Sequence, residues 1–145
     1  MKVTNKSKKI ACAAGTALIL GSVGIGALKL NNYNNNKDYA INMVKTQTSD
    51  INKKCNFDQA YSKYLQHLNY MYYKDHSGNE FVCVSGKLNM PEKDTIEDCK
   101  ITYSIDRKHN TLKFYDMTIG NMHCNQLEAL ELKIRAYSTY DSKNV

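Results

Sequence analysis

The sequence has no tryptophan, a single proline and no motif typical of a catalytic or nucleotide-binding site. It also lacks the C-x-x-C and H-x-x-x-H spacings common in zinc sites, and it lacks the D-x-D-x-D-G loop that binds calcium. After Lys9 there is no run of three Lys or Arg residues, whereas nucleic-acid binders carry a basic patch or stripe. These absences predict no cofactor, no metal, no nucleic-acid partner and no enzymatic activity.

The first nine residues contain four lysines and no acid, and the segment from Ile10 to Leu28 is uncharged throughout. A basic start followed by an apolar run is what an export machinery recognises. About 20 apolar residues are also enough to cross a bilayer as a helix. Residues 1–29 therefore predict a signal anchor that crosses the membrane once, with the N-terminus in the cytoplasm. The alternative is a signal peptide that is cleaved near Ala27 and releases a secreted protein.

The rest of the chain divides into a short spacer and one domain. Residues 30–37 read LNNYNNNK, which is polar and has no apolar periodicity, so we expect a spacer. Residues 38–145 then form a single domain on the exported side of the membrane. The chain carries a formal charge of +6, but four of its lysines precede residue 28, which leaves 16 basic and 14 acidic residues beyond them. The domain is therefore nearly neutral.

The leader also contains one of the five cysteines, Cys12. The domain keeps four: Cys55, Cys83, Cys99 and Cys124. An even number of cysteines in a short exported domain suggests disulfide bonds. They would reinforce the domain, which is long enough to fold without them.

The first half of the domain predicts helices. Asp38 can cap a helix that continues to about Lys54, although the segment TQTSD weakens that helix and can break it. Asn56 is a second good N-cap, with Gln59 as its capping-box partner. Apolar residues then recur at steps of three and four, which predicts a helix of four to five turns that ends before Asp75. They are Phe57, Tyr61, Tyr64, Leu65, Leu68, Met71 and Tyr72.

The second half predicts strands, because the apolar period changes to two. A bulge is expected between Phe114 and Met117, where the alternation slips. Short connections require antiparallel neighbours. The predicted fold is therefore α+β, with one or two helices packed on a four-stranded antiparallel sheet that forms a meander. The expected strands are Glu80–Leu88, Cys99–Asp106, Thr111–Gly120 and a fourth over Leu130–Ala136. The alternative for the last segment is a helical turn that starts over Gln126–Glu131.

This topology also predicts a disulfide pattern. If Asp106 pairs with Thr111, Cys99 lies opposite Thr118, a few residues before Cys124. Their Cα atoms could then come within the roughly 5.5–6 Å that a bridge needs. The predicted pairs are therefore Cys99–Cys124 and, with the two cysteines that remain, Cys55–Cys83.

Two residue sets could carry chemistry, and both have a simpler interpretation. His123 adjoins Cys124, but neighbours on a strand point to opposite faces, so they would not form a thiol–imidazole pair. An acidic segment follows the first strand, and glycosidases use two carboxylates. Four acids on one polar loop are more often a solvated surface. They are Glu92, Asp94, Glu97 and Asp98.

Tyrosine is the unusual component, with eleven residues, five of them between positions 61 and 73. On the expected helix Tyr70 and Tyr73 point away from the apolar stripe. Exposed tyrosines offer a large rigid surface with a polar tip, so these two are the predicted partner-binding residues. The predicted function is a non-catalytic interaction subunit of an envelope complex, for example secretion or conjugation machinery, that binds a protein partner or copies of itself. A secreted effector or inhibitor is the alternative.

Overall fold

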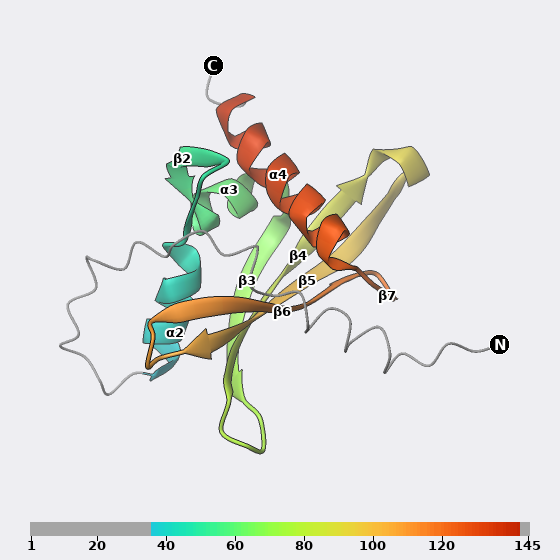
Figure 1. The fold of residues 1–145 in the computed structure, drawn as a ribbon. Coiled ribbons are helices and arrows are strands. Elements are labelled where there is room, and N and C mark those ends of the chain that lie inside the picture. Colours follow the sequence, from blue (N-terminus) through green and yellow to red (C-terminus); the bar gives the residue numbers. More distant parts are fainter. Residues whose placement is uncertain (1–35, 143–145) are drawn as a thin grey trace.

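The computed structural model describes residues 36–142, which form an α+β fold of three α-helices and two antiparallel sheets (Figure 1). The larger sheet has five strands in the order β3-β4-β5-β6-β7, and the smaller is the hairpin β1-β2. In chain order the elements are α2 (Asn36–Lys45), β1 (Thr48–Ser49), β2 (Asn52–Asn56), α3 (Phe57–Tyr64), β3 (Gln66–Lys74), β4 (Glu80–Met90), the 3-10 turn η2 (Pro91–Lys93), β5 (Thr95–Asp106), β6 (Thr111–Ile119), β7 (Met122–His123) and α4 (Gln126–Ser142).

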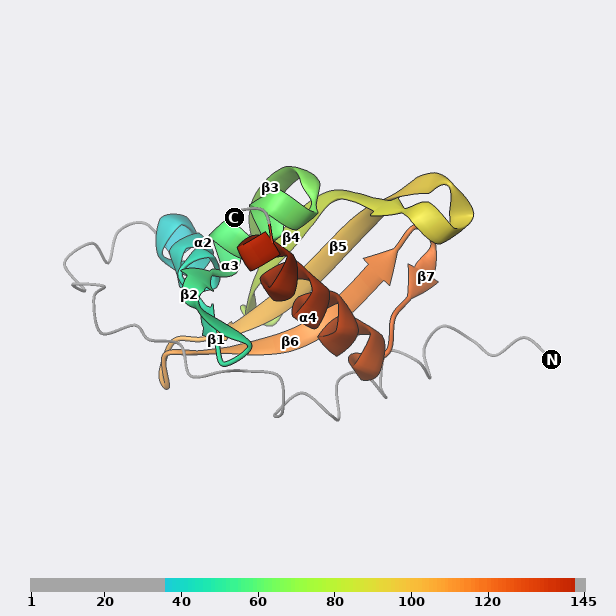
Figure 2. The same cartoon turned by 90° about the horizontal axis from the view of Figure 1, so that it is seen from above.

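The five-stranded sheet has one covered face and one open face. We call the face that carries Val82 and Val84 the inner face, because both residues are fully buried in the core. Helices α2, α3 and α4 all contribute buried side chains to this same core, and Figure 2 shows α4 lying diagonally across the strands. Phe81 and Cys83 alternate with the two valines and so point to the opposite, outer face. The predicted α+β class is confirmed, but the numbers of elements differ from the prediction: the main sheet has five strands and not four, and three helices contribute to the core.

The central hairpins follow the expected register. Asp106 pairs with Thr111, as predicted, and the pairing continues along β5 and β6 until it shifts between Thr102 and Tyr103. On β6 the shift leaves Tyr115 as the extra residue, since Phe114 and Asp116 take the neighbouring pairs. The bulge expected between Phe114 and Met117 is therefore confirmed.

The long aromatic helix predicted after Asn56 is wrong beyond its second turn. The capping box of Asn56 and Gln59 is present, but α3 ends at Tyr64 and Leu65 is already extended. The chain continues as strand β3, which pairs with β4. The two patterns were indistinguishable here, because a step of four residues returns to one face of a helix and also to one face of a strand.

The fourth strand predicted over Leu130–Ala136 is also wrong, because this segment lies within helix α4. Its buried residues recur at helical spacing: Ala129, Leu132, Lys133, Ala136 and Tyr137. Most residues of the segment are strong helix formers. A capping box starts the helix: the Asn125 side chain accepts from the Glu128 N–H at 3.0 Å, and the Glu128 carboxylate accepts from the Asn125 N–H at 2.6 Å.

The first predicted helix is shorter than expected. It ends at Lys45, and the chain then forms the hairpin β1-β2 where the TQTSD segment had suggested a break. The segment predicted to anchor the chain, Ile10–Leu28, lies outside the described residues. Within residues 36–142 no helix is long and apolar enough to cross a bilayer.

The turn from α3 into β3 approaches the sheet closely at Gly86 of β4. A Cβ atom at this position would lie 2.9 Å from the Leu65 Cβ and 3.1 Å from the Gln66 carbonyl oxygen. Only glycine fits without a shift of the backbone. The glycine thus sets how tightly the turn between α3 and β3 packs on the inner face.

Candidate interaction surface

The outer face of the sheet carries an aromatic cluster of Tyr73, Phe81 and Tyr115. The rings of Tyr73 and Phe81 are stacked with their centroids 5.2 Å apart, and Phe81 meets Tyr115 edge-on at 4.8 Å. Phe81 is only 6% exposed although none of the helices within residues 36–142 covers this face, whereas the flanking tyrosines are 38% and 47% exposed. The two tyrosines therefore shield the phenylalanine and present their own rings to solvent. We call these three residues the outer aromatic cluster.

The backbone positions this cluster in two ways. Tyr73 pairs directly with Phe81 across β3 and β4, so their side chains lie side by side. Strand β5 separates β4 from β6 but presents the small side chains of Thr102 and Ser104 outward, which lets the Phe81 ring reach Tyr115. The β6 bulge turns Tyr115 outward, since a bulge lets two consecutive residues face the same side.

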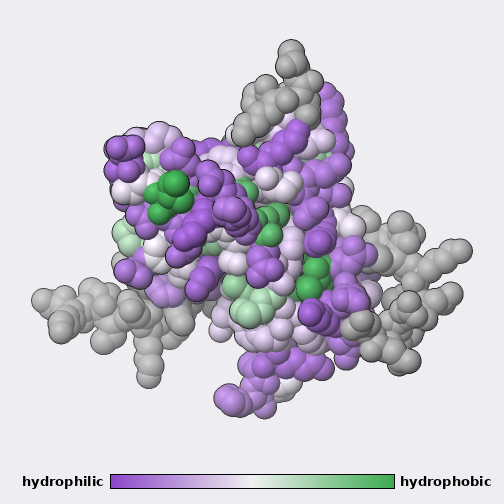
Figure 3. Space-filling model, turned by 180° about the vertical axis from the view of Figure 1, so that it is seen from behind, coloured by the Kyte–Doolittle hydropathy of each residue, from purple (hydrophilic) through white to green (hydrophobic). Residues whose placement is uncertain are grey.

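The outer face is apolar at one end and polar at the other. Beside the cluster lie Met71, which is 55% exposed, and its cross-strand partner Cys83. Further along the strands the outward row is polar, and it consists of Asn69, Ser85, Lys100, Thr118 and His123. Seen from behind, the molecule is mainly hydrophilic with scattered hydrophobic residues (Figure 3).

The two tyrosines predicted to bind a partner lie on opposite faces of β3. Tyr73 belongs to the outer aromatic cluster. Tyr70 faces inward and is partly buried; its hydroxyl donates to Asp58 at 2.8 Å, and the Lys45 ammonium lies 4.8 Å from its ring centroid. Burial and then the Asp58 carboxylate raise the pKa of Tyr70 far above its ordinary value. Tyr70 thus ties α2 and α3 to the sheet, and the two residues do not share one surface.

No disulfide joins the four cysteines of the described residues. Cys99 and Cys124 both contribute to the core, and burial together with the Cys124 thiol raises the pKa of Cys99 to about 12. Strand β6 lies between them, because Cys99 pairs with Ile119 on one side while the Cys124 N–H donates to Met117 on the other. Two strand spacings are roughly 9–10 Å, which exceeds the ~7 Å limit between bridged Cα atoms.

The second predicted pair is separated by the sheet itself. Cys55 belongs to the core on the inner side, whereas Cys83 points to the outer face. The folded arrangement therefore favours neither predicted bridge. The sequence argument failed because it did not foresee the short strand β7, nor that the bulge would place Cys99 opposite Ile119 and not Thr118.

His123 and Cys124 point to opposite sides, as expected for neighbours in an extended segment. The His123 Nδ1 lies 3.2 Å from the Asp116 carboxylate on the outer face, while Cys124 is buried in the core. The four acids do not share one loop: Glu92 and Asp94 lie in the turn between β4 and β5, whereas Glu97 and Asp98 belong to β5, where Asp98 pairs with Lys87 at 2.7 Å. No group of three or more His, Cys, Asp or Glu residues within residues 36–142 could hold a metal ion.

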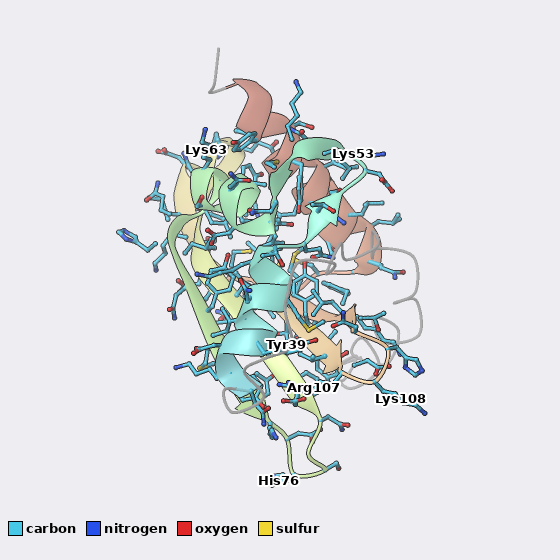
Figure 4. The ribbon with its side chains drawn as sticks, turned by 90° about the vertical axis from the view of Figure 1, so that its left-hand side faces the viewer. Tyr39, Lys53, Lys63, His76, Arg107 and Lys108 are labelled. Carbon is cyan, nitrogen blue, oxygen red and sulfur yellow. The ribbon has the colours of Figure 1, made fainter. Side chains whose placement is uncertain are left out.

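A polar network that the sequence did not reveal joins the start of α2 to the sheet. Arg107 binds both carboxylate oxygens of Glu80, one of them at 2.8 Å through Nη2, and the Tyr72 hydroxyl donates to the same carboxylate at 2.5 Å. Arg107 also donates to the Asn36 carbonyl at 2.8 Å, and its guanidinium lies 4.8 Å from the Tyr39 ring centroid. Figure 4 shows Arg107 and Tyr39 next to each other at the lower end of α2. The network fixes the point at which the chain enters the domain.

This network predicts a pH-dependent contribution to stability. Burial alone would raise the pKa of Glu80, but the bonds from Arg107 and Tyr72 outweigh burial and hold the pKa below its ordinary value. The contribution is therefore present above about pH 4.3, the ordinary Glu pKa, and is lost as the pH falls through the lower folded-state pKa. We expect Glu80→Gln to lower the free energy of unfolding by about 1–3 kcal/mol at pH 7.

Urea unfolding of the wild type and of Glu80→Gln at pH 7 and pH 3 checks this prediction. Asp75, Asp98 and Asp106 also have lowered pKa values, and they titrate in both proteins. The difference between the two proteins should therefore shrink towards pH 3. A difference that stays constant over this range would show that the Glu80 charge does not stabilise the fold.

Comparison of the chain with protein-family models, with curated protein sequences and with solved structures finds no match.

Proposed function

We propose that this chain is a membrane-anchored, non-catalytic interaction subunit of an envelope assembly, and that the outer face of its exported domain binds a protein partner. The observation that carries the proposal is the outer aromatic cluster. Two exposed tyrosines and Met71 surround a shielded phenylalanine on the sheet face that the three helices leave open. Aromatic and Met side chains are enriched in the buried centres of protein interfaces.

The remainder of the face suits a binding surface as well. The polar row from Asn69 to His123 continues the same face, so an apolar centre has a polar border on one side, as interfaces commonly do. The anchor is supported by the sequence alone: the uncharged segment Ile10–Leu28 follows four lysines. Because the Arg107 network ties Asn36 and Tyr39 to the sheet, the anchor would join the domain at a fixed point.

Site-specific photocrosslinking in cells of the source organism tests the binding surface. A photoreactive phenylalanine analogue replaces Tyr115 in the full chain, and in a matched control it replaces Leu127, which is 76% exposed but lies on α4. We expect one discrete protein adduct from position 115 and none of that size from position 127. Adducts of the same pattern from both positions, or none from position 115, would refute the outer face as the binding site.

Fractionation of the same cells tests the location. We expect the full-length chain in the membrane fraction, with its domain accessible to protease added from the exported side. A mature protein in the culture medium that begins near Ala27 would instead support the alternative, a secreted effector or inhibitor.

A further inference from the structure

Strand β3 is an edge strand of the five-stranded sheet. Among the described residues only β4 pairs with it. From Asn69 to Lys74 its pairing with β4 is regular. Within this part the segment Asn69–Tyr73 reads NYMYY, which has no charged residue and no proline. Every second residue of such a strand turns its backbone N–H and C=O groups away from β4. An uncharged, regular edge of this kind is a template for pairing with another strand.

The opposite edge of the sheet shows the protection that β3 lacks. Strand β7 covers Thr118 and Ile119 at one end of β6. The rest of β6 carries the exposed Lys113 and the bulge at Tyr115, and charges and bulges are the usual devices that prevent edge pairing. On β3 the irregular pairing is confined to Gln66–Asn69, where His67 has a φ of +54°. The segment Asn69–Tyr73 is therefore the open edge.

We propose that β3 of one molecule pairs with β3 of a second copy, antiparallel over Asn69–Tyr73 and centred on Met71. In an antiparallel pair of identical strands, the segment pairs with its own sequence read backwards, and this brings matching side chains together. Met71 faces Met71 of the second copy, and the two flanking positions bring Tyr70 opposite Tyr72. Cross-strand aromatic pairs of this kind stabilise antiparallel sheets.

The outer positions and the ends of the segment also fit. Asn69 falls opposite Tyr73, and the first charged residue, Lys74, falls opposite Leu68, so no like charges meet. Met71 and Tyr73 are 55% and 38% exposed in the single molecule, and pairing brings the two outer faces together as one continuous surface. This inference rests on the sheet edge and does not depend on export or on the partner proposed above.

Disulfide crosslinking of the full chain in unfractionated cell extracts tests both the pairing and its register, wherever the chain is located. The background carries Cys12→Ser, which removes the thiol outside the described residues, and Cys83→Ser, which removes the thiol paired with Met71 inside one molecule. In this background Met71→Cys should form a covalent dimer on mild oxidation. Directly opposed residues lie about 4.5–5.5 Å apart, which is within the Cα range of a bridge.

Tyr73→Cys is the matched control, because it lies on the same face of the same strand but opposite Asn69 of the second copy. We expect its dimer yield to be lower by on the order of tenfold, since equivalent positions are then too far apart to bridge. The double variant Asn69→Cys/Tyr73→Cys should restore the dimer. Equal yields from Met71→Cys and Tyr73→Cys, or a Met71→Cys variant that reacts with maleimide but stays monomeric or joins another protein, would overturn the proposal.

Discussion

Replacing Tyr137 with alanine should lower the free energy of unfolding by about 3–5 kcal/mol, the usual cost of removing a large aromatic side chain from a core. Tyr137 is fully buried on α4 and meets the Tyr61 ring of α3 edge-on at 6.2 Å. Its hydroxyl donates to the Gln47 carbonyl at 3.2 Å, and its own carbonyl accepts from Asn52 at 3.2 Å. This one residue therefore joins α4 to α3 and to the β1-β2 hairpin.

Tyr137→Phe is the matched control. It keeps the ring and its packing but removes one hydrogen bond to the Gln47 carbonyl, which still accepts from the Phe57 N–H at 2.7 Å. The loss should therefore cost about 0.5–1.5 kcal/mol. Because the chain has no tryptophan, urea unfolding is followed by circular dichroism. If Tyr137→Ala lost no more stability than Tyr137→Phe, the ring would not be part of the core.

A proline at Ile134 should destabilise the domain by about 3 kcal/mol or more, because proline in a helix interior removes one hydrogen bond and clashes with the preceding turn. Ile134 lies near the middle of α4 and is 44% exposed. Ile134→Ala loses the same exposed side chain but preserves the helical backbone, so its effect should stay below about 1 kcal/mol. The difference in stability between the two variants therefore measures the cost of breaking the helical backbone.

Thermal and urea unfolding of the two Ile134 variants measure this contrast. The outcome also decides between the helix and the alternating strand that the sequence had suggested for Leu130–Ala136. Proline is tolerated far better on the edge of a sheet, where the N–H can face solvent. Similar stabilities of Ile134→Pro and Ile134→Ala would therefore contradict a helical α4.

The central meander was predictable because its signals are local. Alternation in Cys99–Asp106 and Thr111–Ile119 shows strands with one buried face, and the short turn between them sets the register. The slip between Phe114 and Met117 was visible as two apolar residues out of phase. Each of these features depends on residues close together in the chain, so no tertiary information was needed.

The two segments assigned to the wrong type of element are those where one apolar pattern fits both a helix and a strand. Leu68 and Tyr72 share a face in a helix and in a strand, and pairing with β4 decided for the strand. In α4, apolar and charged residues alternate from Leu130 to Ala136, as they would in a half-buried strand. The capping box of Asn125 and Glu128 indicates a helix. The alternating apolar pattern that follows it indicates a strand, and the prediction followed the alternation.

The candidate surface was predictable only in part. Tyr73 was identified, but for a helical reason that proved wrong, and Tyr70 turned out to support the inner face. Phe81 and Tyr115 were missed as surface residues. Phe81 stands next to Val82 in an apolar run, and the sequence does not tell which of two adjacent apolar residues faces the helices.

The sequence by itself determined the near-neutral charge of the chain beyond residue 28, the period of the central strands and the place of the bulge. All three follow from residues that are neighbours in the chain. Only the tertiary structure decided which face of the sheet the helices cover, that Gln66–Lys74 joins the sheet, and that within residues 36–142 only β4 pairs with it. These features depend on contacts between distant segments, such as Tyr137 with Gln47 and Arg107 with Asn36, whose geometry local periodicity does not encode.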